Sequence, residues 1–510
     1  MASRERRTLN EPLDISLPFW DPDNALFVAD SAPQFDPATA SGLLRWRRHG
    51  RSAELHFNTV DFELGPPRHR EFPDVYGTDP ELPFALEFIT PRTVRLRLRA
   101  ATEPRTQQEE LMLDGPVPSD ETWQCEAADA GATYTGSAGV SVTVSTDPWS
   151  VAVRAPDGRL LTRTFTRRPR QGMPFSFVRR VDDMRRHVAA SFALAPDEGI
   201  YGCGESFTRL NKRGQKLALW HYDAWECQGQ GMYKPIPFFL SSRGYGIFVH
   251  TSAPLTFDFG HTHDGVATLY SGDDELDLFI FAGTPKEVLA EYTALTGRSP
   301  LPPLWSFGLW MSRITYDSEQ QARDVAARLR QERVPCDVIH LDTGWFETDW
   351  CCDYVFSASR FPTPERMLAD LREQGFRICL WQLPYITPIN RLYREALDAG
   401  YVVRGPDGGL PTDDAILDFS NPDAVRWYQE KLAGLLRMGA AAIKVDFGEA
   451  APLDGGYASG LSGLYEHCLS PLRYNKAAAD VTLQTTGEHV IWARSAWAGS
   501  QRYPLHWGGD

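Results

Sequence analysis

Short runs in which apolar and polar residues alternate dominate the first 300 residues. The clearest are TVRLRLRA (93–100), VSVTVST (140–146), VAVRAP (151–156), GIFVHTSAPLTFDFG (246–260) and ELDLFIFAG (275–283). A period of two, with Gly, Pro and Asp turns between the runs, is typical of antiparallel strands that bury one face. We therefore predict an N-terminal β-sandwich domain over residues 1–300, with a helix at PKEVLAEYTALTG (285–297) near its end.

The pattern changes after residue 300, where short apolar runs alternate with amphipathic segments. We predict strands at WSFGLWM (305–311), DVIHLDTGW (337–345), FRICLWQL (376–383), AAIKVDF (441–447) and VIWARSA (490–496). Parallel strands need helical crossovers, so repeated strand–loop–helix units indicate a TIM-type (β/α)₈ barrel over residues 301–510. In such barrels the chemistry collects where the strands end and the βα loops begin.

Capping signals mark the ends of the barrel helices. Asp317 and Gln320 have the spacing of a capping box. Thr363 and Pro364 open a second helix that ends at Gly375. A later helix repeats this pattern, with Asn421 as its cap, Pro422 at its first position and Gly439 at its end.

The number of strands predicts a barrel that is incomplete at its C-terminus. Beyond the five runs, only YPLHW (503–507) offers another strand, and its connection from Ala496 is too short for a helical crossover. At most about six of the eight strands of a closed barrel are present. We expect the sheet edges and the apolar surface left uncovered to favour aggregation.

Charge and cysteine content exclude several classes of protein. The formal net charge of −15, with 67 acidic and 52 basic residues, disfavours nucleic acid and anionic membranes as partners. We find neither the roughly 20 apolar residues of a membrane helix nor a secretory signal. The eight cysteines lack C-x-x-C spacing, which predicts reduced thiols in a cytoplasmic protein. A homo-oligomeric state is left open.

Polar and aromatic residues gather at the predicted strand ends. They are Asp342, Gln382, Asp446 and Arg494, together with Trp310, Trp345, Trp381 and Trp507. A tryptophan in a barrel strand is more often a core residue, and a single strand-end aspartate often only caps the next helix. The joint placement nevertheless favours a carbohydrate ligand, because indole faces meet sugar C–H groups while carboxylates bind hydroxyls. We assign no metal role to His261 and His263, because no further ligand cluster accompanies them.

The motif IKVDFGE (443–449) resembles that of the retaining α-glycosidases of glycoside hydrolase family 31. Further segments resemble the family in the same order: YGCGESF (201–207), LTGRSPLPPLWSFGLW (295–310), IHLDTGWF (339–346), FRICLWQLPY (376–385) and ARSAWAGSQRYPLHWGGD (493–510). The resemblance implies a galactose-mutarotase-like N-terminal domain, a catalytic barrel and a site without a cofactor.

Carried over to this sequence, the resemblance implies that Asp446 is the nucleophile and Asp510 the general acid/base of a double displacement. It further implies that Asp342, Lys444 and Arg494 bind sugar hydroxyls, and that Trp345, Trp381 and Trp507 wall the subsite. Lys444 and Arg494 should keep Asp446 ionised, whereas Asp510 must hold its proton. We interpret Glu449 as an anchor of the loop, with a polar role in the site as a fallback.

K-x-D-F-G-E, together with the lone Asp of the H-x-D segment, resembles the α-xylosidase branch. Where these enzymes carry Cys-Phe, this chain has Thr343 and Gly344, which predicts a roomier pocket. We therefore expect an exo-acting hydrolase of terminal, non-reducing α-linked sugars in oligosaccharides or small α-glycosides. The sugar is xylose or a hexose such as glucose or galactose. The alternatives are an inactive truncated fragment with residual carbohydrate binding, and a transglycosylase or lyase of the same fold.

Overall fold

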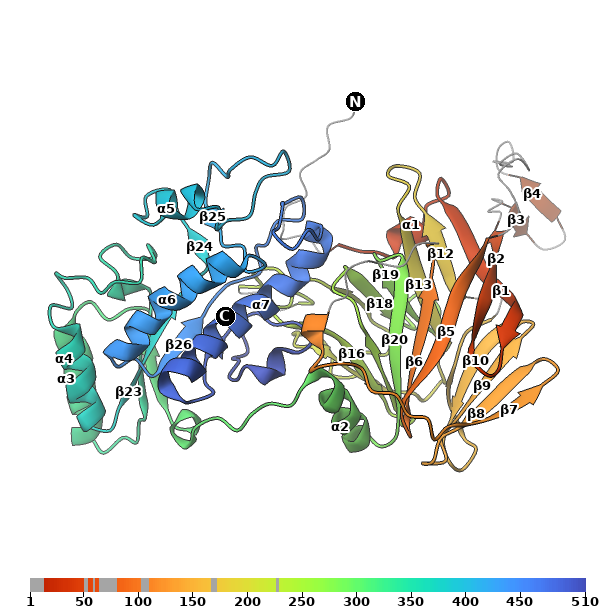
Figure 1. Ribbon diagram of the computed structural model, residues 1–510, viewed down its shortest axis with the longest axis horizontal. Helices are drawn as coiled ribbons and strands as arrows, with labels where there is room; N and C mark the ends of the chain where they lie inside the picture. The colour runs from red at the N-terminus through yellow and green to blue at the C-terminus, as the bar shows by residue number, and fades with distance from the viewer. Residues whose placement is uncertain are drawn as a thin grey trace.

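The computed structural model describes residues 13–49, 54–57, 60–63, 80–101, 110–166, 172–225 and 229–510. Two regions lie side by side in it (Figure 1). One consists of antiparallel sheets, drawn in red to green, and the other is a mixed α/β region, drawn in green to blue.

The antiparallel region is built on a 13-stranded sheet. Its strands, in spatial order, are β14 (Ile200–Gly204), β16 (Pro235–Ser241), β17 (Tyr245–Val249), β20 (Glu275–Ala282), β6 (Thr93–Arg99), β5 (Glu81–Thr90), β2 (Ser41–His49), β1 (Ala25–Asp36), β12 (Ser176–Arg179), β13 (Arg186–Ala193), β19 (Val266–Ser271), β18 (Leu255–Phe259) and β15 (Lys216–Leu219). A short helix, α1 (Leu17–Trp20), precedes the sheet, and β3 (Glu54–Phe57) pairs with β4 (Val60–Glu63) as a separate ribbon.

A second sheet of five strands completes the sandwich. In order these are β11 (Leu160–Arg163), β10 (Trp149–Arg154), β9 (Ser141–Thr146), β8 (Gly131–Thr135) and β7 (Gln124–Ala128). Alternate residues of β9 and β10 are buried. Trp149 meets Phe84 and Phe175 edge to face, at centroid distances of 5.8 and 5.4 Å. The predicted β-sandwich is confirmed, because its alternating runs at 93–100, 140–146 and 151–156 form strands β6, β9 and β10.

The second region contains one parallel sheet. Its strands are β21 (Trp310–Arg313), β22 (Val338–Leu341), β23 (Arg377–Gln382), β26 (Ala442–Val445) and β27 (Trp492–Ala493), in chain order across the sheet. Each lies within or overlaps a predicted run. Instead of a sixth strand, the YPLHW segment makes a single parallel bridge between His506 and Ala493. The sheet is therefore an open, partial barrel.

Helices connect these strands. They are α3 (Glu319–Gln331), α4 (Pro364–Glu373), α5 (Tyr393–Asp398), α6 (Pro422–Met438) and α7 (Gly463–Thr486), with the short hairpin β24 (Tyr385–Ile386) and β25 (Ala415–Ile416) between α4 and α6. In Figure 1, α6 and α7 lie next to each other over β26.

The cap positions agree with the sequence at α4 and α6 but not at α3, although the Thr363 side chain makes no capping hydrogen bond at α4. Asn421 accepts a hydrogen bond from the Asp423 amide and Gly439 ends α6 with φ 126°. The cap of α3 is Ser318, whose hydroxyl accepts from the Gln321 amide, so the predicted box at Asp317 and Gln320 is wrong by one residue. Both pairs have capping-box spacing, and only the backbone decides between them.

The two regions share a buried interface. Helix α2 (Pro285–Thr296) and the turn η3 (Leu304–Phe307) lead from one to the other. The His221 ring nitrogen Nε2 lies 2.7 Å from the Ala496 carbonyl oxygen, and Trp220 stacks on His467 with ring centroids 4.0 Å apart. Residues of the sandwich therefore reach the carboxyl end of the parallel sheet.

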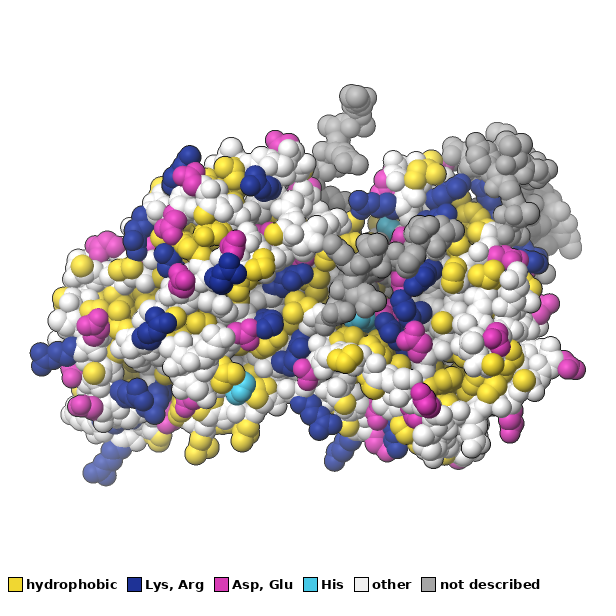
Figure 2. Space-filling model, viewed as in Figure 1, with side chains coloured by type: hydrophobic (Ala, Val, Ile, Leu, Met, Phe, Trp, Pro, Cys, Tyr) yellow, Lys and Arg dark blue, Asp and Glu magenta, His cyan; other side chains and the backbone are white. Residues whose placement is uncertain are grey.

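Charges of both signs are distributed over the surface. On the face drawn in Figure 2, Lys and Arg lie among Asp and Glu and do not gather into one basic patch. None of the helices in the described ranges is long and apolar enough to cross a membrane. The seven cysteines placed by the structure are free thiols.

Candidate active site

The carboxyl ends of the parallel strands bring charged residues to one edge of the sheet. Asp342 directly follows β22, Asp446 follows β26 and Arg494 follows β27. Lys444, within β26, pairs in register with Trp381 of β23. The side chains of these five residues, the four charged ones and Trp381, are buried. The strand-end residues that the sequence indicated as polar thus meet at one place, as parallel topology requires.

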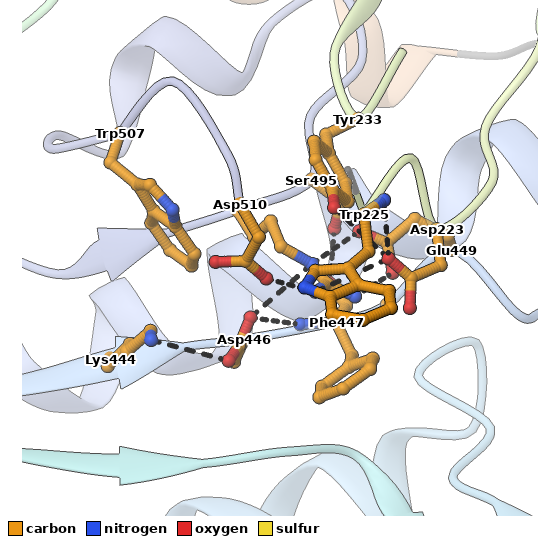
Figure 3. Close-up of polar contacts among 12 residues, drawn as sticks. Asp223, Trp225, Tyr233, Lys444, Asp446, Phe447, Glu449, Ser495, Trp507 and Asp510 are labelled. Atoms are coloured by element: carbon orange, nitrogen blue, oxygen red, sulfur yellow. Dashed lines mark hydrogen bonds and ion pairs between the residues drawn. The ribbon is translucent and has the colours of Figure 1, made fainter. Parts of the chain in front are cut away.

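Arg494 contacts three acidic side chains of this cluster, Asp446, Glu449 and Asp510, which are labelled in Figure 3. Its Nε and Nη2 donate to the two carboxylate oxygens of Glu449, both at 2.9 Å. Its Nη1 donates to Asp510 Oδ2 at 2.9 Å, and its Nε lies 3.3 Å from Asp446 Oδ1. Phe447 covers one face of the guanidinium at 3.9 Å. One side chain therefore contacts both predicted catalytic carboxylates and anchors Glu449.

Lys444 provides the second positive charge. Its Nζ lies 3.3 Å from Asp342 Oδ2 and 3.4 Å from Asp446 Oδ2. Asp446 also accepts hydrogen bonds from the Trp381 indole N–H at 2.7 Å and from the Phe447 amide at 2.9 Å. Burial alone would lower the pKa of Lys444, but attraction to Asp446 and Asp342 outweighs it, so the pKa is raised. The ammonium form is favoured.

Asp342 has a buried partner, His340, that was not among the predicted site residues. The buried His340 lies with Nε2 2.7 Å from Asp342 Oδ2, and the Thr343 amide donates to Oδ1 at 3.0 Å. Burial opposes ionisation of Asp342, but His340 and Lys444 outweigh it and hold the pKa of this carboxyl below its usual value. Because His340 lies two residues before Asp342 in an extended segment, their shared face was a signal available in the sequence.

The three tryptophans of the predicted wall differ in exposure. Trp345 and Trp381 are 1% and 0% exposed, and the Trp345 indole donates to the Trp381 carbonyl at 2.9 Å. Trp507 is half-buried and lies beneath the Lys444 ammonium at 4.8 Å. Trp350, which was not predicted, is 51% exposed and meets Trp381 edge to face at 5.4 Å. Exposed indole surface is therefore provided by Trp507 and Trp350.

Two other strand-end residues pack against their neighbours. The Trp310 indole donates to the Ser306 carbonyl at 3.0 Å. Gln382 donates to the Lys444 carbonyl at 3.1 Å and to the Tyr474 hydroxyl at 2.8 Å. Trp310 and Gln382 therefore make the contacts expected of packing residues.

The space beside Gly344 is already filled. A Cβ added at Gly344 would lie 1.8 Å from the Thr315 hydroxyl oxygen and 2.8 Å from its Cβ. Thr315 has φ +68°, and its hydroxyl is buried without a hydrogen-bond partner. The roomier pocket expected from Thr343 and Gly344 is therefore not found at position 344, because Thr315 from the preceding βα loop takes the volume.

The β-sandwich contributes to the same cluster (Figure 3). The Tyr233 hydroxyl donates to Asp223 at 3.1 Å, and the Tyr233 ring lies 4.7 Å from the Arg494 guanidinium carbon. Gly509, with φ +100°, packs so closely that an added Cβ would lie 2.3 Å from the Tyr233 ring. These sandwich residues lie in a loop with no strand or helix pattern, and no sequence signal identified them.

A pocket of about 220 Å³ opens between this loop and the end of the chain. It is lined by Glu205, Ser206, Phe207, Ala224, Gly231, Tyr233, Lys234 and Gly508. Phe207 is 71% exposed, so the pocket offers an aromatic face to solvent next to the carboxylate cluster.

The two histidines of the HTHDG segment lie in the turn between β18 and β19. Among the residues that the structure describes, no group of three or more His, Cys, Asp or Glu side chains could hold a metal ion.

Comparison with known proteins identifies both regions. Residues 83–258 match the glycosyl hydrolase 31 N-terminal galactose mutarotase-like domain, and residues 299–510 match the glycosyl hydrolases family 31 TIM-barrel domain. The alpha-xylosidase XylQ of Lactiplantibacillus pentosus is 36% identical over 351 residues, which are 66% of this chain and 45% of that protein. Alpha-glucosidase 2 of Bacillus thermoamyloliquefaciens is 27% identical over 406 residues, 73% of this chain and 49% of that protein. The chain thus spans about half the length of these curated relatives.

A solved structure shows the same fold. The family 31 dextranase of Flavobacterium johnsoniae, bound to isomaltotriose, superposes with a TM-score of 0.76 at 21% identity, over 95% of this chain and 56% of the dextranase. With both domains matched in order, the chain belongs to glycosyl hydrolase family 31.

Proposed function

We propose that the chain forms the site of a retaining α-glycosidase, in which Asp446 is the nucleophile and Asp510 the general acid/base. The observation that supports this most directly is their shared contact with Arg494, at 3.3 and 2.9 Å. Contact with one guanidinium gathers both carboxyl groups at the same place, and a retaining mechanism requires about 5 to 5.5 Å between them.

The proposed reaction has two steps. Asp446 attacks the anomeric carbon while Asp510 gives its proton to the leaving oxygen, which leaves a covalent glycosyl ester on Asp446. Asp510, now ionised, takes a proton from water, and the resulting hydroxide displaces Asp446 to release the sugar with its configuration retained. Four donors surround the Asp446 carboxyl group: Lys444, Arg494, the Trp381 indole and the Phe447 amide.

The sugar is proposed to lie between Asp342, Lys444 and Arg494, which bind its hydroxyls. Trp507 gives its half-buried indole to the wall of this subsite, and the buried Trp345 and Trp381 support the wall from behind. Ionised Asp342 accepts from hydroxyls, whereas Lys444 and Arg494 donate to them. Asp446 and Asp510 complete the ring of polar groups.

Substitution of the two aspartates tests the proposal. Asp446→Ala should abolish hydrolysis of phenyl α-glycosides, and Asp510→Ala should slow it by about 10²- to 10⁴-fold, the usual contribution of a general acid. Asp480→Asn is the matched control, because Asp480 pairs with Lys476 on α7 at 2.5 Å. Full activity of Asp446→Ala would refute the assignment. If the unaltered chain binds sugar without turnover, the alternative of carbohydrate binding alone holds.

For the sugar itself we propose an α-xylosidase-like preference, with a hexose as the alternative. The higher identity to the alpha-xylosidase, 36% against 27% for the alpha-glucosidase, supports xylose. Hydrolysis of p-nitrophenyl α-xyloside, α-glucoside and α-galactoside by equal amounts of protein measures the preference, and a much higher kcat/KM for either hexoside would contradict it.

A further inference from the structure

Lys234 is a buried cation of the sandwich that reaches the end of the chain. Its side chain is 7% exposed, and its ammonium donates to the Trp507 carbonyl and, at 3.4 Å, to the Arg494 carbonyl. Glu205 Oε2 lies 2.8 Å from the same nitrogen. One ammonium thus joins the segment that follows β27 to the turn that carries Asp510.

The base of this side chain is held by strand pairing. Glu205 follows β14 and its amide donates to the Lys234 carbonyl at 3.2 Å, while Gly204 pairs with Pro235 of β16. The backbone of Lys234 is therefore held where β14 and β16 pair in the 13-stranded sheet, so its position is well fixed.

Among the described residues, the backbone of the turn at 507–510 has few other supports, although the Trp507 ring packs 5.3 Å from Trp492 and 4.8 Å from the Lys444 ammonium. The Trp507 amide donates to the Ala493 carbonyl at 3.3 Å, Gly509 packs on Tyr233 with φ +100°, and Asp510 ends in the contact with Arg494. Asp510 itself is exposed. Because two glycines precede it, the backbone of this turn is free to take other conformations unless outside contacts fix it.

We propose that Lys234 is a positioning residue for proton delivery: it fixes the turn at Trp507 and thereby the carboxyl group of Asp510. The inference rests on the proposed function of Asp510 as general acid/base. A misplacement of about 1 Å in such a group can cost 10²-fold in rate. The sandwich domain would then take part in catalysis through a side chain that never touches the substrate.

Leaving-group dependence tests this role. A phenyl α-glycoside needs a proton on its departing oxygen, whereas a glycosyl fluoride loses fluoride with little need for one. We expect Lys234→Met to lower kcat/KM for the phenyl glycoside about 10- to 100-fold, and to change kcat/KM for the α-glycosyl fluoride by less than about threefold. An equal loss on both substrates, or no loss on either, would overturn the proposal.

Two further variants separate the possible failures. Lys216→Met is the matched control, because Lys216 is another sandwich lysine paired with a carboxylate, Asp14, at 2.6 Å; it should behave as the unaltered chain on both substrates. Asp510→Asn should show the same leaving-group dependence more strongly. If it does not, the role of Asp510 is wrong, whatever the result for Lys234.

Should Lys234→Met fail to fold, Glu205→Gln replaces it. This variant keeps the bonds of the ammonium to the two carbonyls and weakens only its anchor. We expect a several-fold loss on the phenyl glycoside and no change on the fluoride, and any other pattern would contradict the positioning role.

Discussion

Even with Asp510 protonated, as its proposed role requires, the carboxylates around Arg494 and Lys444 outnumber these two cations. Arg494 contacts Asp446, Glu449 and Asp510, and lies 3.8 Å from Asp223, while Lys444 contacts Asp342 and Asp446. Glycoside cleavage passes through an oxocarbenium-like state in which the sugar becomes positive. An excess of fixed negative charge in a buried site stabilises such a state more than it stabilises the neutral substrate.

Gly344 allows a direct test of packing at the site. Gly344→Ala should lower the free energy of unfolding by about 1–3 kcal/mol, the usual cost of overpacking, because the new Cβ would lie 1.8 Å from the Thr315 hydroxyl oxygen. Urea denaturation measures the change. The matched control is Gly434→Ala in α6, where a Cβ meets no atom within 4 Å. It should stabilise the protein by about 0.5–1 kcal/mol.

A second substitution checks that Thr315 is the cause. Thr315→Gly removes the clashing atoms and also suits φ +68°, a conformation that β-branched residues rarely adopt. Most of the stability lost in Gly344→Ala should therefore return in the double variant. Losses that simply add would show that the clash lies elsewhere.

At the scale of elements, strand order and strand ends were predictable because the parallel strands are continuous apolar runs between helices. The segment 441–447 contains β26 and ends with Asp446 and Phe447 outside the strand, as the expected βα loop requires. The YPLHW segment was less predictable: its strand-like composition yields one bridge at His506, because pairing depends on the neighbouring strand and not on local propensity.

The pattern of apolar and polar residues could not predict which elements contact one another. Burial of Trp345, with its indole bonded to the Trp381 carbonyl, could not be distinguished from a sugar-facing position, because both place a tryptophan at a strand end. The contributions of Tyr233 and Lys234 come from a loop more than 200 residues before Arg494 in sequence, and no local period records such contacts. The prediction that Gly344 leaves extra space was wrong for the same reason, because Thr315, which fills that space, belongs to another loop.

For the whole molecule, the interface between the two regions couples stability to pH through buried histidine. His221 lies between them with Nε2 2.7 Å from the Ala496 carbonyl oxygen. Burial, with a smaller effect of His467, lowers the pKa of His221 to about 3. Since an unfolded histidine has a pKa near 6.5, the unfolded state binds an extra proton between these values, and stability must fall as pH falls through this window.

His221→Gln should remove this dependence. Glutamine can place an N–H donor near the position of Nε2 but does not titrate. Between pH 7 and pH 5, the stability of the unaltered chain relative to His221→Gln should fall by about 2 kcal/mol, as 1.36 kcal/mol per pH unit implies over the 1.5 units below 6.5. Between pH 7 and pH 8 the difference should change by less than about 0.2 kcal/mol, because the unfolded imidazole binds only about a quarter of a proton at pH 7 and less above it. Urea denaturation at the three pH values measures it. Parallel stability curves down to pH 5 would mean that His221 takes up a proton in the folded protein, and that the interface opens to water more readily than its burial indicates.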